Sequence, residues 1–218
     1  MKKIIFTTLV AIIATLFVCG CSQTNIEKYS DKISDYRYVF MEAETEDFRI
    51  EGISGKRETP FAPDDVCSSK KTDYTVFTVT PYSGLLSGEK GELTFSQGET
   101  EVTLTLTRHP FKKTYSAETS LKIEPSAEEG LTITVCGKTV TLYPRQPEIE
   151  SEYAFTLALE QVGSRLNTWN NYEIYIRLSE NTVTMADGLY WVITFNHDET
   201  TTSVLVSADN GEITAVRG

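Results

Sequence analysis

The sequence predicts a mainly β protein: an N-terminal antiparallel β-sandwich, immunoglobulin-like as the commonest choice, and a small C-terminal α+β domain with one helix on an antiparallel sheet. Three observations carry this prediction. Between residues 36 and 145, apolar and polar residues alternate in short segments, which is the period of half-buried strands. No convincing helical period occurs in that range. After Pro144 and Pro147 the apolar period becomes that of an amphipathic helix.

The first 20 residues have the parts of a secretory signal peptide. Lys2 and Lys3 form the basic start, and an apolar run from Ile4 to Val18 is followed by small residues. The run is shorter than the about 20 residues of a membrane span. We therefore expect residues 1–20 to be removed, with a retained short anchor as the alternative.

The tetrapeptide "VCGC" at residues 18–21 resembles the lipobox of bacterial lipoproteins, which has an aliphatic residue, two small residues and a cysteine. The resemblance implies that Cys21 receives a diacylglyceryl group and becomes the N-terminus of an extracytoplasmic protein anchored to a bacterial cell membrane. Each buried methylene contributes about 0.8 kcal/mol, so a two-chain lipid gives a durable anchor. Residues 21–35 are mostly polar and predict a tether behind the lipidated cysteine.

The charge of the chain excludes one class of partner. The formal net charge is −11, and removal of the two signal-peptide lysines leaves −13. Such a field repels nucleic acid, and the pairs Lys70-Lys71 and Lys112-Lys113 are too short to form a basic patch.

Seven or eight strands are expected between residues 36 and 145, and these make up the sandwich. Alternation is clearest in residues 100–109, where Val102, Leu104 and Leu106 alternate with threonines. Residues 131–144 predict a hairpin with its turn at Gly137-Lys138. The other segments with this period are residues 36–44, 47–54, 73–81 and 114–123.

Residues 146–218 predict the second domain. A helix starts near Ser151, because Phe155, Leu159, Val162 and Leu166 form an apolar stripe at helical spacing. Four strands follow, and the last two form a hairpin around residues 209–211, "DNG".

The end of the chain resembles the PepSY domain and its relatives. Val206, Ala208, Gly211, Glu212 and Ile213 match the Val-Asp-Ala-x-Thr-Gly-Glu-Val type of signature. Ser207 and Asn210 depart from it, standing where the family has aspartate and threonine. The resemblance implies an extracytoplasmic module that restrains peptidases and has no catalytic residues of its own.

Export determines the state of the remaining cysteines. Cys67 and Cys136 stay in the mature chain, in a compartment that permits oxidation. They either pair as a disulfide or remain two independent thiols.

The sequence contains no catalytic motif that we recognise, so no enzyme, metal or cofactor is predicted. The two histidines, His109 and His197, are far apart and lack a zinc-peptidase spacing. Neither a nucleophile elbow nor a glycine-rich phosphate loop occurs.

One cluster is a candidate binding surface: Trp169, Asn170, Asn171 and Tyr172, directly after the helix. Aromatic rings stack on the apolar faces of sugars, and amides satisfy polar groups. The structural alternative is that Trp169 caps the helix–sheet core.

Two functions therefore compete. The first is a lipid-anchored, non-catalytic envelope protein that binds or restrains another protein, with a peptidase as the partner implied by the PepSY resemblance. The second is a lipoprotein that binds carbohydrate or cell wall through the Trp169 and Tyr172 cluster.

Overall fold

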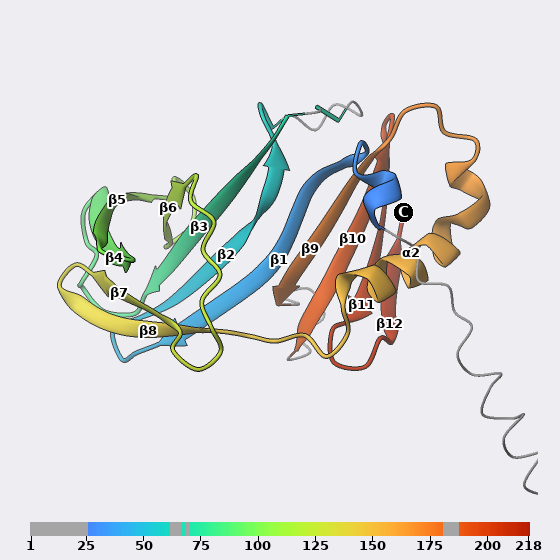
Figure 1. The fold of residues 1–218 in the computed structure, drawn as a ribbon. Coiled ribbons are helices and arrows are strands. Elements are labelled where there is room, and N and C mark those ends of the chain that lie inside the picture. The colour runs from blue at the N-terminus through green and yellow to red at the C-terminus, as the bar shows by residue number, and fades with distance from the viewer. Residues whose placement is uncertain (1–25, 62–66, 69, 181–187) are drawn as a thin grey trace, which may run out of the picture.

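The computed structural model describes residues 26–61, 67–68, 70–180 and 188–218, and the fold is mainly β (Figure 1). Two helices are present in the described residues: a short 3₁₀ helix η1 (Ile26–Tyr29) and an α-helix α2 (Ser151–Leu166). The strands are β1 (Ile33–Glu44), β2 (Phe48–Glu58), β3 (Lys71–Pro81), β4 (Lys90–Gln97), β5 (Thr100–Arg108), β6 (Tyr115–Thr119), β7 (Leu131–Val135), β8 (Lys138–Pro144), β9 (Glu173–Glu180), β10 (Leu189–His197), β11 (Thr200–Ser207) and β12 (Ile213–Arg217).

The eight strands before α2 form a closed antiparallel barrel, so the predicted β-sandwich is wrong. Neighbours in the barrel follow the order β1-β2-β3-β6-β5-β4-β7-β8, and β8 returns to pair with β1 at Met41 and Glu42. The number of strands agrees with the prediction. Alternation identifies the buried face of each strand but not its neighbour, and a sandwich and a barrel present the same alternation.

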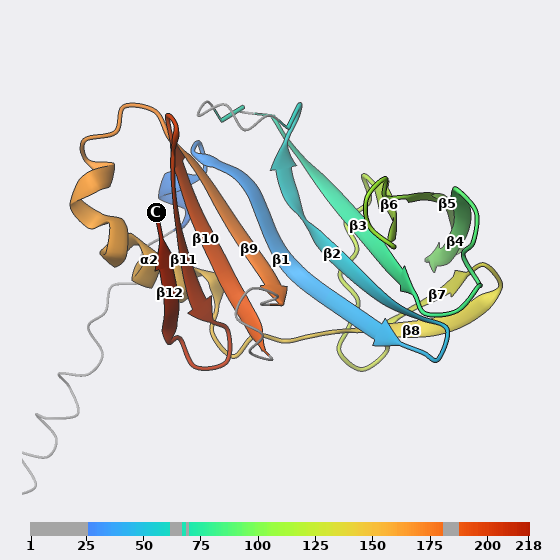
Figure 2. The same cartoon turned by 180° about the vertical axis from the view of Figure 1, so that it is seen from behind.

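The C-terminal segment is not a separate domain. As predicted, α2 packs on an antiparallel sheet of β9 to β12, against β10 and β11. However, β9 pairs in parallel with β1, with Ile33 opposite Ile174 and Arg37 opposite Arg177. Strand β1 therefore belongs to both parts, and Figure 2 shows it running between the barrel and the smaller sheet.

The fold starts earlier than the predicted tether of residues 21–35 allows. Helix η1 begins at Ile26, and β1 begins at Ile33, whose side chain is 7% exposed. Ser34 and Asp35 are also buried. The polar composition predicted solvent-exposed residues, but Ser34 and Asp35 are buried because each has a buried partner far along the chain.

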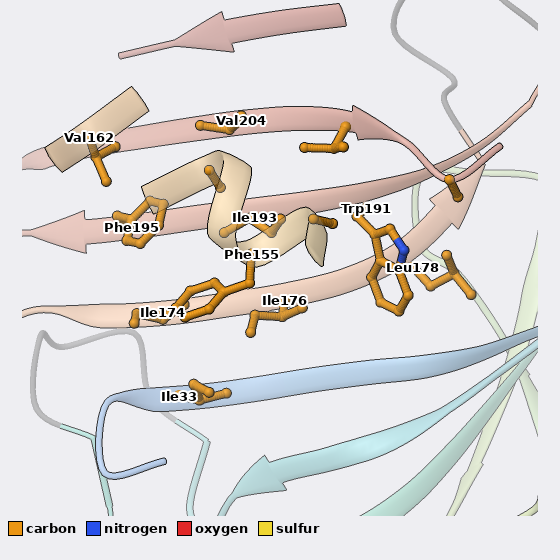
Figure 3. Close-up of a cluster of buried hydrophobic side chains, with 14 of the residues drawn as sticks. Ile33, Phe155, Val162, Ile174, Ile176, Leu178, Trp191, Ile193, Phe195 and Val204 are labelled. Carbon is orange, nitrogen blue, oxygen red and sulfur yellow. The ribbon is translucent and has the colours of Figure 1, made fainter. Parts of the chain in front are cut away.

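Two hydrophobic cores hold the molecule together. The first lies between α2 and the sheet, where Phe155 and Val162 of α2 belong to one buried cluster with side chains of β1, β9, β10 and β11 (Figure 3). The second fills the barrel and includes Met41, Phe77 and Leu106. Phe155, Ile174 and Phe195 are fully buried in the first core, and Phe77 and Leu93 in the second.

Strand β1 contributes to both cores and contains a β-bulge. Successive strand residues point to opposite faces, so Val39 and Met41 pack on the barrel core while Phe40 joins the other core. The register with β2 shifts between Arg37 and Val39. Gly55 of β2 permits this close approach, since a Cβ there would lie 2.3 Å from the carbonyl oxygen of Tyr36.

Both predicted hairpins exist, with one correction. The β7–β8 turn is formed by Cys136 and Gly137, with φ of 47° and 84°, one residue earlier than predicted. Gly137 supplies the second positive φ of a two-residue turn. In the β11–β12 hairpin, Gly211 alone takes a positive φ, of 75°. Among the described helices, none is long and apolar enough to span a bilayer.

Candidate functional site

A cavity of about 580 Å³ lies beside η1, between this helix and one face of β1, β2 and β3. Its apolar lining includes Ile26 and Ile33, and the rings of Tyr36 and Tyr38 also line it. This volume is within the range of pockets that hold small ligands, about 300–1,000 Å³. The sequence-based search missed it, because its residues come from four distant segments. The closest sequence signal is "YRY" at residues 36–38, which puts two tyrosines on one face of a strand.

The two tyrosines form the aromatic part of the cavity. Their ring centroids are 5.2 Å apart, with an angle of 56° between the ring planes. The hydroxyl of Tyr36 shares a hydrogen bond of 2.7 Å with Oγ of Ser151, at the start of α2. The hydroxyl of Tyr38 is buried beside the carboxylate of Glu124, but it makes no hydrogen bond of good geometry within the described residues. A buried hydroxyl without a well-formed hydrogen bond is unfavourable, so a ligand that supplied one would stabilise it.

Charged side chains surround the tyrosines. Lys122 lies 5.8 Å from the ring centroid of Tyr38, and its amine contacts Glu124 at 2.9 Å. Lys56 lies 3.9 Å from Oδ1 of Asp73, a buried atom without a hydrogen-bond partner in the described chain. Lys71 donates to the carbonyl of Ile33 at 2.6 Å. The cavity therefore offers both cationic donors and anionic acceptors.

The tyrosine hydroxyls keep their protons at neutral pH. Burial raises the pKa of Tyr38 above its usual value, and the nearby negative charge of Glu124 raises it further. Burial also raises the pKa of Tyr36, against the lowering effect of its hydrogen bond to Ser151. Both hydroxyl groups therefore stay neutral and keep a proton that can be donated in a hydrogen bond.

The predicted binding cluster is partly structural. Trp169 and Tyr172 are half-buried against the first core, and their ring centroids are 6.2 Å apart. The ring of His197 stacks on Trp169 at 4.9 Å, and its Nδ1 lies 2.6 Å from the carbonyl oxygen of Asn171. The side chains of Asn170 and Asn171 are exposed. The packing of Trp169 thus agrees with its structural alternative, with one ring face covered by His197.

Cys67 and Cys136 are two independent free thiols, the second of the two alternatives left open by the sequence, and they lie in different loops. Cys67 lies between β2 and β3, where its sulfur contacts the amine of Lys71. Cys136 is exposed in the β7–β8 turn, and its sulfur lies 3.7 Å from the carbonyl oxygen of Glu92. Cys21 and the predicted signal peptide lie outside the described residues.

The residues of the PepSY-like signature mainly build the hairpin. Val206 and Ala208 are completely buried, and the backbone N–H of Ala208 donates to the carbonyl of Leu189. Gly211 supplies the positive φ of the turn. Ser207, one of the two departures, is 8% exposed. These positions pack and turn the chain, so they leave few side chains for contact with a partner.

Comparisons of the chain with protein-family models, curated protein sequences and solved structures gave no match.

Proposed function

We propose that this chain is a lipid-anchored, extracytoplasmic, non-catalytic binding protein of the bacterial envelope, with its ligand site in the cavity beside η1. The observation that carries the proposal is a cavity of ligand size lined by Tyr38, whose buried hydroxyl lies beside Glu124 without a well-formed hydrogen bond. In a ligand-bound protein this hydroxyl gains the hydrogen bond that it lacks here.

The anchor part of the proposal rests on the sequence of the first 21 residues. Cys21 precedes Ile26 by five residues, which span at most about 18 Å when fully extended. The lipid would then hold η1, and the cavity beside it, close to the bilayer surface. Metabolic labelling with a fatty-acid analogue tests this: we expect label on the wild-type protein and none on C21A. Label retained by C21A would overturn the assignment.

The chemistry of the cavity favours a carbohydrate ligand. Tyrosine rings stack on the apolar faces of sugar rings, while hydroxyl, lysine and carboxylate groups bond to sugar hydroxyls. Tyr36 and Tyr38 supply the rings, and Lys56, Lys122 and Glu124 supply the polar groups. Carbohydrate is the ligand class of the second function considered from the sequence, and the proposal moves its site from Trp169 to the cavity.

The test uses isothermal titration of residues 22–218 with soluble N-acetylglucosamine oligosaccharides. We expect binding to the wild type and a loss of at least about tenfold for Y38F, which removes one hydrogen bond to the ligand and no ring surface. The matched control is W169F, which changes an aromatic residue at the other cluster and should leave binding unchanged. Loss of binding in W169F with none in Y38F would return the site to Trp169.

A second candidate function is protein binding, with a peptidase as the partner that the PepSY resemblance implies. One structural observation favours it: within the described chain β12 pairs with β11 alone, so its outer edge is open to an added strand. The substitution A215P on β12 tests it by crosslinking in intact envelopes. Loss of a specific crosslinked protein supports edge pairing, and an unchanged pattern excludes it.

A further inference from the structure

The outer face of the shared sheet carries a buried carboxylate that holds two arginines. Asp35 of β1 is 1% exposed, and its Oδ2 accepts hydrogen bonds from Nε of Arg37 at 2.9 Å and Nε of Arg177 at 2.8 Å. Its Oδ1 accepts a bond of 2.6 Å from the hydroxyl of Tyr74. Both oxygens of Asp35 are therefore in use.

The charges of this group do not balance. In the described part of the chain, Asp35 is the one carboxylate that forms an ion pair with either Arg37 or Arg177. Within this ion-paired group, two guanidinium charges face one carboxylate charge. The next carboxylate on the same face of β9, Glu173, is buried and accepts hydrogen bonds from Tyr175 and Ser34. Each guanidinium has five N–H donors, of which Asp35 takes the one on Nε. The two arginine side chains are 31% and 29% exposed, so solvent and ligands can reach them.

Aromatic side chains frame the pair. The guanidinium of Arg177 lies 4.6 Å from the ring centroid of Tyr175, and Phe61, 41% exposed, lies 6.1 Å from the same ring. A third arginine, Arg57, lies 4.5 Å from the ring centroid of Tyr74 and is paired with Glu118. These rings hold the cations in place and add an exposed apolar contact beside them.

We propose that Arg37 and Arg177 form a docking site for a carboxylate in an acidic segment of a protein partner, with Phe61 contacting an apolar residue of that segment. Paired guanidinium groups match the planar geometry of a carboxylate and bind it with two hydrogen bonds. The site lies on the opposite face of β1 from the cavity, because successive strand residues point to opposite faces and Tyr36 lines the cavity. The inference is therefore independent of the cavity ligand.

The negative net charge of the chain does not prevent this contact. Exposed charges separated by more than the Debye length, about 8 Å at about 0.15 M salt, are largely screened. The local excess of positive charge at the arginine pair therefore decides the interaction at short range. This face can therefore attract an acidic segment of a partner, although the net charge of the chain that carries it is −11.

The experiment measures fluorescence anisotropy of a rhodamine-labelled hexaglutamate peptide with residues 22–218 at about 0.15 M salt. We expect saturable binding of hexaglutamate and none of hexaglutamine. The variants R177Q and R177K should both raise the Kd by at least about tenfold, because lysine keeps the charge but not the fork of donors. In each single variant, Asp35 keeps its hydrogen bonds to Arg37 and Tyr74. Circular dichroism checks that each variant is folded.

The matched control is R108Q, which removes one exposed positive charge from the barrel end of the molecule. It should change the Kd by less than about twofold. Equal loss in R108Q and R177Q would show unspecific attraction and overturn the proposal, as would an affinity in R177K equal to that of the wild type. Absence of hexaglutamate binding, or tighter arginine-dependent binding to phosphatidylglycerol vesicles or inorganic phosphate, would also overturn it.

Discussion

Arg145, which follows β8, donates a hydrogen bond from Nη1 to Oε1 of Glu180, the last residue of β9, over 3.1 Å. Arg49 of β2 reaches Oε2 of the same carboxylate at 2.5 Å, and both arginines also contact Glu42 of β1. These contacts lie where β8 and β9 separate along β1. The network therefore connects the barrel to the smaller sheet at the point where the backbone pairing of these two parts stops.

Removing the charge of Glu180 should weaken this connection. We expect E180Q to lower the free energy of unfolding by about 1 kcal/mol, since the pairs are partly exposed and Glu42 remains. Urea unfolding followed by circular dichroism measures the change. The control is E199Q, an exposed residue in the β10–β11 turn. Equal stability of E180Q and E199Q would show that the network does not connect the two parts.

Glu51 predicts a pH effect of defined sign. Burial raises its pKa above the usual 4.5; Arg49 opposes this, and the charges of Glu180 and Glu42 add to it. The folded protein thus holds this proton more tightly than the unfolded chain, so stability falls as the pH rises from about 4.5 through the raised pKa. The difference between the melting temperature of E51Q and that of the wild type should therefore increase in favour of E51Q as the pH rises across that interval. An advantage of E51Q that shrinks as the pH rises would contradict this.

The two cavity tyrosines should respond differently to loss of their hydroxyl groups. Y36F loses the hydrogen bond to Ser151 and should lower the free energy of unfolding by about 1 kcal/mol. Y38F removes a buried hydroxyl that makes no well-formed hydrogen bond and lies beside Glu124, so its stability should equal or exceed that of the wild type. The pair is its own control, because each variant removes one oxygen atom. A destabilised Y38F would show that its hydroxyl already has a partner.

The cysteines predict two titratable thiols in folded residues 22–218. Cys136 is exposed and should react rapidly with Ellman's reagent, whereas half-buried Cys67 should react more slowly. The variant C136S should retain the slow phase alone. If no thiol reacted, and the protein changed its mobility on gels after reduction, the two cysteines would be paired and this prediction would be wrong.

Local structure was largely predictable from the sequence. The stripe of Phe155 and Val162 identified α2, and the alternation of Val102, Leu104 and Leu106 identified β5. These signals depend on residues close in sequence. Strand β4 was not predicted as a separate strand.

Pairings between distant strands were not predictable. Ser34 and Asp35 looked like tether residues, yet Ser34 donates to Glu173 at 3.0 Å and Asp35 holds Arg177. Their partners lie about 140 positions away, as the register of β1 with β9 shows. The cavity was missed for the same reason, because its lining comes from η1, β1, β2, β3 and the segment after β6.

The position of β1 between the two parts also determines when the fold can be completed. Ile33 is among the first of the described residues to be synthesised, and its neighbour Ile174 follows after most of the chain. Until then one edge of β1 lacks its partner, and the apolar face that α2 later covers is open to solvent. Loop closure over such a separation makes folding slow. The N-terminal strand therefore waits longest for its pairing partner, although it is made first.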